Sequence, residues 1–209
     1  MYQSNIRGTE SERKSKLKIN KMINPFLIGN KIYLSQLSQN DISDRYINWL
    51  NDEEVCRDNS HARFPNTRSK TLSYIEHLEK SKDETAFAIR WKKNDLHIGN
   101  AAIQKIDRIN RSAELAILIG DKKYWGKGIA SEVYELLIKY GFDTLNLNRI
   151  SSGQTIANKG MIKVCERSGM KKEGILRQVL YKQGEYLDAA VYSILKREFE
   201  KVKKHIKNK

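Results

Sequence analysis

The stretch LIGDKKYWGKGIASEV, residues 118–133, carries the pattern that decides the fold. A short apolar run of strand character leads into a turn that holds Gly126 and Gly128, and helical sequence follows with the small residue Ala130. Glycines at the start of a helix leave main-chain N–H groups uncovered at the positive end of the helix dipole, where anions bind. Positive charge is added beside the turn by Lys122, Lys123 and Lys127. The stretch predicts a strand–turn–helix unit with an anion site at the turn.

Two familiar phosphate-binding patterns do not fit this turn. It lacks the GxxxxGK[ST] sequence of a Walker loop, and Ser131 stands where the GxGxxG pattern needs its third glycine. For these residues taken alone, a strand-to-helix turn that binds nothing remains the alternative.

Apolar periodicity on both sides of the turn predicts the elements around it. Alternating runs at Ala86–Trp91, His97–Ile106 and Ala113–Gly120 are typical of an antiparallel meander. Helical spacing follows over Gly128–Thr144, and another strand is predicted over Arg149–Ile156. A strand–helix–strand unit of this kind implies that the strands before and after the helix run parallel.

The remaining elements complete a mixed sheet. Folded sequence is predicted to start near Pro25, and the other predicted elements are a strand over 31–37, helices from Asn40 or Asp41 to Leu50 and over 69–80, a helix over 158–168 ended by Gly169, and strands over 173–181 and 186–195. The predicted class is α+β. We expect a single domain with a mostly antiparallel sheet, one parallel pair of strands and flanking helices.

Length and charge bound the domain organisation. With 209 residues, of which 39% are hydrophobic, the chain suits one compact domain. We expect that domain over residues 26–197, between a basic extension over 1–25 and a basic tail over 198–209. The two ends carry much of the net charge of +14. Lys-rich ends either solubilise a chain or contact nucleic acid.

Several classes of protein are not expected from this composition. No apolar run approaches the ~18 residues of a membrane helix, and the N-terminus lacks a signal-peptide core. Cys56 and Cys165 do not make a disulfide framework, and the histidines show no metal-ligand spacing. No recognition helix, zinc site or aromatic RNA-binding signature appears, so nucleic acid is not an expected partner. We expect a cytoplasmic protein with no metal and no membrane partner.

Two motifs at the right separation identify a family resemblance. Trp125–Ala130 resembles the Q/R-x-x-G-x-G/A loop of the GNAT acetyltransferases, with Gly128 and Ala130 at the small positions and Trp125 in place of Gln or Arg. The second motif, N-x-x-S/A-x-x-x-x-E-K-x-G-F, is matched by Asn158, Glu166, Arg167, Gly169 and Met170. Over residues 30–197 the chain looks like the branch that includes ribosomal-protein N-terminal acetyltransferases and nucleotide-aminosugar acetyltransferases of surface-polysaccharide pathways.

The resemblance implies acetyl-CoA as cosubstrate, bound in a gap between the splayed strands 113–120 and 149–156. Pantetheine would lie in that gap, and the pyrophosphate on residues 126–130. Asn158 would hold the pantetheine arm, although an Asn there also suits the N-cap of its helix. Many members form dimers, so a homodimer is expected. The cofactor-binding residues that the resemblance implies are Leu118, Ile119, Trp125, Gly126, Lys127, Gly128, Ile129, Ala130, Asn158 and Arg167.

Direct transfer to an amine requires a base and an acid. A lysine-type amine has a pKa of ~10.4 and an α-amino group of ~8, and only the neutral amine attacks the thioester. Glu114 is the first candidate base, with an exposed strand carboxylate as the alternative, because Gly153 stands where many relatives carry a glutamate. Cys165 aligns with the tyrosine acid of many relatives, or packs as a small hydrophobe. Further candidates for the acid are Tyr181, Tyr186 and Tyr192. A strand N–H near Leu118 or Ile119 is the expected oxyanion donor.

Two acceptors are compatible with the sequence. The first is a nucleotide-linked amino sugar, a surface-polysaccharide precursor, whose diphosphate would bind Arg57, Arg63 and Arg68 near His61, unless these are solvated loop residues. The second is the N-terminus of a ribosomal or other protein. A GNAT-like binding module without catalysis is the non-enzyme alternative, against which the intact glycine turn argues.

Overall fold

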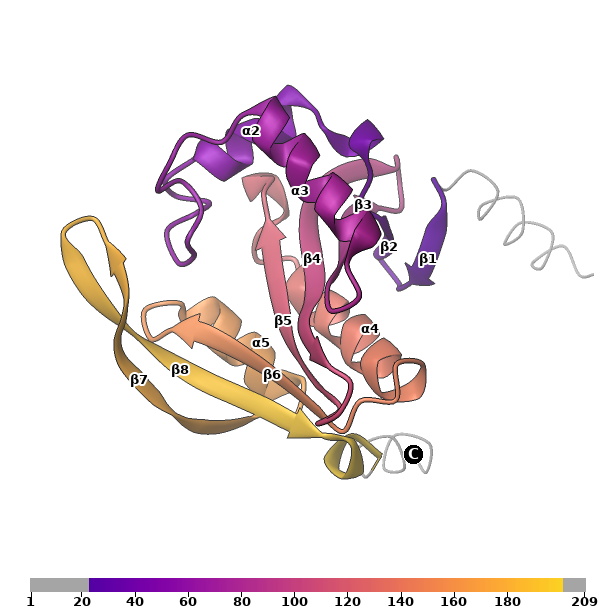
Figure 1. The fold of residues 1–209 in the computed structure, drawn as a ribbon, viewed down its shortest axis with the longest axis vertical. Coiled ribbons are helices and arrows are strands. Elements are labelled where there is room, and N and C mark those ends of the chain that lie inside the picture. The colour runs from indigo at the N-terminus through magenta and orange to yellow at the C-terminus, as the bar shows by residue number, and fades with distance from the viewer. Residues whose placement is uncertain (1–22, 201–209) are drawn as a thin grey trace, which may run out of the picture.

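The computed structural model describes residues 23–200, which fold around one twisted sheet (Figure 1). Within these residues the sheet has eight strands in the order β1-β2-β3-β4-β5-β6-β8-β7. The strands are β1 (Pro25–Ile28), β2 (Ile32–Gln36), β3 (Thr85–Trp91), β4 (Leu96–Asp107), β5 (Ser112–Ile119), β6 (Arg149–Thr155), β7 (Lys171–Lys182) and β8 (Glu185–Leu195). The helices are α2 (Asp44–Asn51), α3 (Arg68–Lys80), α4 (Ile129–Asp143) and α5 (Lys159–Arg167), with short 3-10 turns η1 (Gln39–Asp41) and η2 (Lys122–Tyr124).

The strand pairing confirms the predicted mixed sheet. β5 and β6 run parallel, and every other neighbouring pair of described strands is antiparallel. The parallel pair is joined by α4, as the strand–helix–strand pattern predicted. The class is α+β, with the helices flanking a single sheet.

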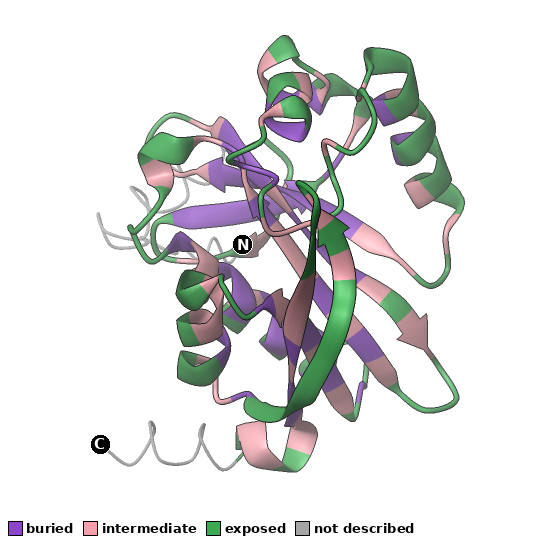
Figure 2. Ribbon diagram, turned by 90° about the vertical axis from the view of Figure 1, so that its left-hand side faces the viewer, coloured by how far each residue is buried: buried purple, intermediate pink, exposed green. Residues whose placement is uncertain are grey.

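Helices cover both faces of the sheet. One core cluster joins α4 to the sheet through residues such as Val133, Leu137 and Leu115, all at most 2% exposed. A second cluster, on the opposite face, joins α2 and α3 to the sheet through Trp49, Ile75 and Leu118 among others. Because side chains of a strand alternate between faces, β5 contributes to both clusters. Figure 2 shows the buried strands between these two helical layers.

The helix predicted from Asn40 or Asp41 begins later than expected. Ser43 is the N-cap of α2 and accepts a hydrogen bond from the Tyr46 N–H. Asp41 cannot cap α2 because its buried carboxylate pairs with Arg90 and also accepts from the Ser38 N–H at 2.8 Å. The capping box with Ser38 and the ion pair with Arg90 of β3 commit Asp41 to the short turn η1, and α2 begins after Ser43.

The β7–β8 hairpin projects from the end of the sheet (Figure 1). Most of β7 is exposed, as Figure 2 shows. Large apolar side chains lie exposed on this hairpin at Ile175, Leu176, Val179, Tyr181 and Tyr186. Just after β8, Phe199 packs on Phe142 of α4, with ring centroids 5.3 Å apart.

The predicted extension over 1–25 and tail over 198–209 lie largely outside the described residues. Among the helices of residues 23–200, none has the length and apolar character that crossing a membrane requires.

Candidate functional site

The glycine turn before α4 is open, as an anion site requires. Gly126 and Gly128 have φ values of 71° and 78°, which glycine adopts without strain, and Gly128 is the N-cap of α4. A Cβ built on Gly126 would meet nothing within 4 Å, and one on Gly128 would meet only the Lys31 Nζ atom, at 3.9 Å. No described side chain therefore fills the space in front of these main-chain donors, and the turn fits a phosphate.

The parallel strands β5 and β6 separate just past their first residues. Their ladder pairs Ser112, Ala113 and Glu114 with Arg149, Ile150 and Ser151, and these are the only partners that the ladder holds in residues 23–200. Beyond them, the Ser152 hydroxyl donates to the Leu115 carbonyl at 3.2 Å and lies 2.8 Å from the Tyr134 hydroxyl. A side-chain hydroxyl thus satisfies the Leu115 carbonyl at the point where the main-chain ladder ends.

The main-chain N–H groups of successive β5 residues point alternately toward β4 and toward the gap. The Gly120 N–H donates to the Ile98 carbonyl of β4, and in an antiparallel pair every second residue points the same way. Leu118 therefore directs its N–H toward β4, whereas Ile117 and Ile119 direct theirs toward the gap. The Trp125 indole N–H donates to the Ile119 carbonyl at 2.8 Å, which agrees with this direction.

Ile117 is thus a main-chain donor that we did not predict. Leu118 was the expected donor together with Ile119, but its N–H belongs to the ladder with β4. The main-chain N–H groups of successive strand residues point to opposite edges of the strand. Counting every second residue back from the turn would therefore have assigned the N–H groups of Ile117 and Ile119 to one edge and that of Leu118 to the other.

A cavity of about 530 Å³ runs from the glycine turn into the gap. Lys127 is the one predicted cofactor residue outside its lining: its carbonyl accepts from Lys31 Nζ at 2.9 Å, and its own Nζ lies 5.1 Å from the Tyr124 ring centroid. The predicted residues that do line this cavity are Leu118, Ile119, Trp125, Gly126, Gly128, Ile129, Ala130, Asn158 and Arg167.

Asn158 caps α5 and lies in the wall of the first cavity. Its side-chain oxygen accepts from the Met161 N–H at 3.1 Å, which caps α5, and the residue also lines the 530 Å³ cavity. The cap fixes the side chain of Asn158 at the wall of the gap.

A second cavity, of about 700 Å³, lies on the face of the sheet that carries α2 and α3. It meets the first cavity where β5 and β6 separate. Both cavities are lined by Asp58, Asn59, Glu114, Ala116, Ile117, Leu118 and Gly153. A group held in one cavity can therefore reach a group held in the other across this junction.

Glu114 lies at that junction. It accepts hydrogen bonds from Gln104 Nε2 at 3.1 Å and from Lys105 Nζ at 2.8 Å, and its side chain is 31% exposed. The two contacts orient the carboxylate while leaving it in reach of both cavities.

The predicted acids lie elsewhere. Cys165 is fully buried, burial raises the pKa of its thiol to about 11, and it lines neither of the two cavities. Tyr192 is also buried and outside both linings, and burial raises the pKa of its phenol. Tyr181 and Tyr186 are exposed and contact each other at the hairpin tip, with ring centroids 4.9 Å apart.

The three arginines predicted to bind a diphosphate do not converge. Arg57 lines the first cavity, with Nε 3.6 Å from an Asp58 carboxylate oxygen. Arg63 donates to the Tyr181 carbonyl at 3.2 Å, and Arg68 donates to the Ile42 carbonyl and to Asp44. His61 lines the 700 Å³ cavity and stays exposed. Within residues 23–200, no group of three or more His, Cys, Asp or Glu side chains is arranged to hold a metal ion.

An open anion turn, two diverging parallel strands and two cavities that meet between them define the class of an acyltransferase that binds acetyl-CoA. Residues 31–171 match the family model described as acetyltransferase (GNAT) domain. The chain belongs to the GNAT acetyltransferase family, and it is an N-acetyltransferase with acetyl-CoA as cosubstrate.

Curated relatives agree with this membership. The chain is 37% identical over 128 residues to the uncharacterized N-acetyltransferase p20 of Bacillus licheniformis, which covers 61% of this chain and 71% of the relative. It is 30% identical over 178 residues to the uncharacterized N-acetyltransferase YoaA of Bacillus subtilis, covering 82% and 97%. To the putative ribosomal N-acetyltransferase YdaF of Bacillus subtilis it is 38% identical over 102 residues, covering 49% of this chain and about half, 55%, of the relative.

Solved structures share the fold. A probable acetyltransferase matches with a TM-score of 0.75 at 26% identity, covering 83% of this chain and 98% of the other. The spermidine N-acetyltransferase of Vibrio cholerae, solved with CoA and spermine, matches with a TM-score of 0.74 at 23% identity, covering 81% and 98%.

Proposed function

We propose that this enzyme transfers the acetyl group of acetyl-CoA to the primary amine of a small cationic acceptor held in the 700 Å³ cavity. The observation that carries the proposal is the shared lining of the two cavities at Asp58, Glu114 and Gly153, where β5 and β6 separate. An amine that enters from the face of α2 and α3 comes there within reach of a thioester that enters from the glycine turn.

The chain's own groups supply binding and electrostatics. Acetyl-CoA supplies the activated acetyl group as a thioester. The N–H groups of residues 126–130 bind its diphosphate, and Asn158 contacts the pantetheine arm. The N–H groups of Ile117 and Ile119 face the gap and donate to the carbonyl oxygen, which gains negative charge as the amine attacks.

Glu114 is the base of this proposal. An acceptor amine is protonated near neutral pH and has to lose a proton before or during attack. Glu114 takes that proton, directly or through one water, because its carboxylate lines both cavities. Cys165 and Tyr192 lie behind the cavity walls, so we assign the proton of the leaving sulfur to solvent in the open gap.

The charges of the 700 Å³ cavity favour a cationic acceptor. Three carboxylates line it, those of Asp58, Glu84 and Glu114, together with the ammonium groups of Lys70 and Lys105, so the charged side chains of the lining carry a small net negative charge. Spermidine N(1)-acetyltransferase of Escherichia coli is 29% identical over 101 residues. These observations support a small polyamine-like amine. The N-terminus of a protein is the second candidate, supported by the similarity to the putative ribosomal N-acetyltransferase YdaF.

The nucleotide-linked amino sugar remains a prediction from sequence. Its diphosphate was expected to bind Arg57, Arg63 and Arg68, of which none lines the 700 Å³ cavity. The lining holds Lys70 and Lys105 beside its three carboxylates, and its small net negative charge favours an ammonium group over a diphosphate.

A thiol-release assay with an amine panel tests the proposal. The panel holds spermidine, peptides with free N-termini, and nucleotide-linked amino sugars, each with saturating acetyl-CoA. We expect the highest kcat/KM with the small cationic amine. A preference of more than tenfold for the nucleotide-linked sugar would contradict the proposed acceptor class.

Binding of acetyl-CoA is measured separately by thermal shift. A ligand at a hundred times its Kd stabilises a fold by about 2.7 kcal/mol. An unchanged melting temperature would contradict the cofactor site itself, whichever acceptor is used.

A further inference from the structure

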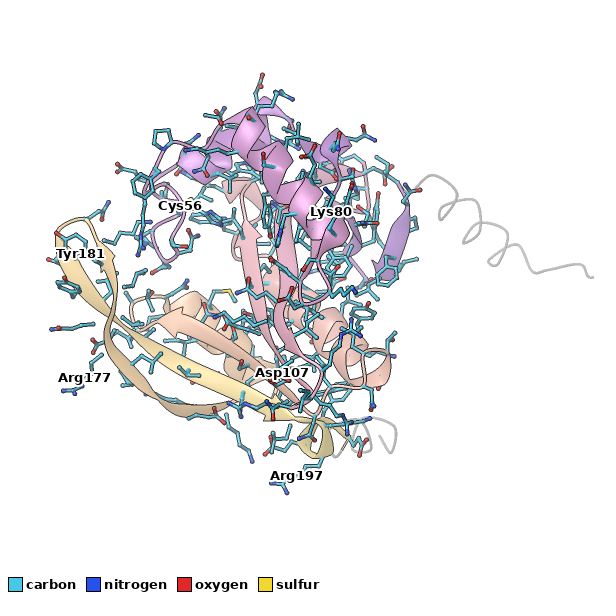
Figure 3. The ribbon with its side chains drawn as sticks, in the orientation of Figure 1. Cys56, Lys80, Asp107, Arg177, Tyr181 and Arg197 are labelled. Atoms are coloured by element: carbon cyan, nitrogen blue, oxygen red, sulfur yellow. The ribbon has the colours of Figure 1, made fainter. Side chains whose placement is uncertain are left out.

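Lys182, near the tip of the β7–β8 hairpin, makes an unusual set of contacts. Its ammonium donates to three main-chain carbonyls of one loop: those of Cys56, Asn59 at 2.9 Å and His61 at 3.0 Å. A lysine ammonium has three protons to donate, so this contact uses all of them. Figure 3 labels Cys56 in the loop and Tyr181 beside Lys182 on the facing hairpin.

The loop that Lys182 holds, residues 52–61, forms a wall common to both cavities. Its Asp58 and Asn59 line both of them. A second lysine, Lys122, ties the loop to the turn before α4. Its ammonium pairs with the carboxylates of Asp52 at 2.8 Å and Glu54 at 2.6 Å. Val55 and Cys56 anchor the first half of the loop in the second core cluster, and the lysine contacts hold the half that carries Asp58.

Asp58 is the carboxylate that this loop places at the junction. Its side chain is 17% exposed, and its carboxylate accepts from the Thr155 hydroxyl at the end of β6, at 2.5 Å. The nearest cation described for it is Arg57, at 3.6 Å, beyond hydrogen-bond distance. Glu114, by contrast, is already bonded to Lys105 at 2.8 Å. A carboxylate has about four acceptor positions, so Asp58 retains capacity for a further donor.

We propose that Asp58 binds the ammonium group of the acceptor at the junction of the two cavities, and that Lys182 is the positioning residue that holds Asp58 there from the hairpin tip. This inference rests on the proposed function, since it needs an amine acceptor. It divides the work between two carboxylates: Asp58 binds the cation, and Glu114 takes the proton.

The hairpin serves both parts of this arrangement. Leu176, Val179 and Leu180 of β7 line the 700 Å³ cavity, and the ammonium of Lys182 fixes the loop that faces them. Arg63 adds a second tie, from the end of the loop to the Tyr181 carbonyl at 3.2 Å. The wall of the acceptor cavity and the position of Asp58 therefore depend on the same hairpin.

Two variants and a control separate binding from positioning. Asp58→Asn removes the charge but keeps an oxygen for the Thr155 hydroxyl. Lys182→Met keeps the aliphatic stem but removes the ammonium. Lys172→Met removes an exposed charge from the same hairpin and is the matched control. Amide hydrogen exchange is measured over the loop and over α4, Kd for acetyl-CoA by calorimetry, and KM and kcat by thiol release with each amine of the panel.

Three results are expected. Asp58→Asn raises the KM of the amine about tenfold or more, as for loss of a hydrogen bond to a charged group, with the acetyl-CoA Kd within twofold. Lys182→Met raises loop exchange at least tenfold without changing α4, and raises the amine KM severalfold. Lys172→Met changes neither.

The outcomes that overturn the inference differ from those that overturn the proposed function. Unchanged loop exchange in Lys182→Met contradicts the positioning role, and an unchanged amine KM in Asp58→Asn contradicts the ammonium contact. A wild-type enzyme that binds acetyl-CoA but acetylates no amine of the panel contradicts the proposed function. The ammonium contact then falls with it, and the exchange result still decides the role of Lys182.

Discussion

Gly128→Asp is the sharpest test of the anion turn, because the structure separates its effect on folding from its effect on binding. Gly128 is the N-cap of α4 with a φ of 78°. A Cβ built on it would meet only the Lys31 Nζ atom, at 3.9 Å. Asp tolerates left-handed backbone better than most residues and is a favoured N-cap. Because a positive φ still strains a residue with a Cβ, we expect the free energy of unfolding to fall by about 1 kcal/mol, which leaves the variant folded.

The loss of binding follows from charge. The new carboxylate would lie beside a diphosphate held on the N–H groups of the turn. Two unit charges about 4 Å apart repel by about 4 kcal/mol at an effective dielectric constant near 20, which corresponds to roughly a thousandfold in Kd. The carboxylate would also accept hydrogen bonds from the N–H groups that the diphosphate needs.

Calorimetry with two ligands measures this effect. We expect Gly128→Asp to lose acetyl-CoA binding by roughly a thousandfold, and to bind S-acetylpantetheine, which lacks the diphosphate, as the wild type does. Gly184→Ala is the control, because Gly184 also has positive φ, 87°, in a turn far from the glycine loop in sequence, and it should leave both affinities unchanged. Binding of acetyl-CoA to Gly128→Asp within threefold of wild type would refute the placement of the diphosphate.

Four further predictions follow from described contacts. Glu114→Gln should lower kcat at least a hundredfold in thiol release while the acetyl-CoA Kd stays within twofold, as expected for a general base; an unchanged kcat would remove Glu114 from the chemistry. Lys31→Met should raise the acetyl-CoA Kd about fivefold at low salt and less at 0.5 M salt, because the Lys31 ammonium lies beside Gly128. Cys165→Ser should keep kcat and its pH profile within twofold, since burial raises the thiol pKa to about 11 and the thiol lines neither cavity; a drop of tenfold or more would restore Cys165 as the acid. Arg149 lowers the pKa of Glu173 from near 4.5 to about 2, so the pair stabilises the fold above pH 4.5 and this contribution is lost as the pH falls toward 2. The Glu173 side chain is 40% exposed, so the free energy of unfolding of Glu173→Gln should be only about 1 kcal/mol below that of the wild type at pH 7. Urea unfolding at pH 7 and pH 3 measures this difference, which should shrink at pH 3.

Local periodicity predicted most of the fold. The strands of the meander, α4, β6 and α5 begin and end within a few residues of their predicted bounds. β1 (Pro25–Ile28) was not predicted, because four residues with no long alternation give too weak a signal. The helix predicted from Asn40 or Asp41 is divided into η1 and α2, because Asp41 is held by its capping box with Ser38 and by the ion pair with Arg90 of β3, a residue distant in sequence.

The two halves of the site differ in how far the sequence could predict them. The cofactor half rests on one short segment, the glycine turn with Asn158 nearby, and nearly all of its predicted residues line the first cavity. The acceptor half is assembled from α2, α3, the loop between them and the β7–β8 hairpin, and its lining includes residues as far apart in sequence as Tyr46 of α2 and Val191 of β8. Asp58 and Lys182 carry no motif, and only their contacts reveal them. For the same reason, Arg57, Arg63 and Arg68 are close in sequence but point to three different places.

The gap between β5 and β6 is a property of the chain itself, because side chains of β6 satisfy carbonyls of β5 where the ladder ends. Ser151, the last β6 residue of the ladder, donates to the Ala113 carbonyl, and Ser152, just past the ladder, donates to the Leu115 carbonyl, each at 3.2 Å, while Gln154 donates to the Ser152 hydroxyl at 2.8 Å. Side-chain hydroxyls satisfy the carbonyls of β5 on one side, so the strands need not close to avoid orphaned polar groups. The slot is therefore formed before any ligand arrives. Acetyl-CoA then meets N–H groups that are already aligned, and little of its binding energy is spent on separating the strands.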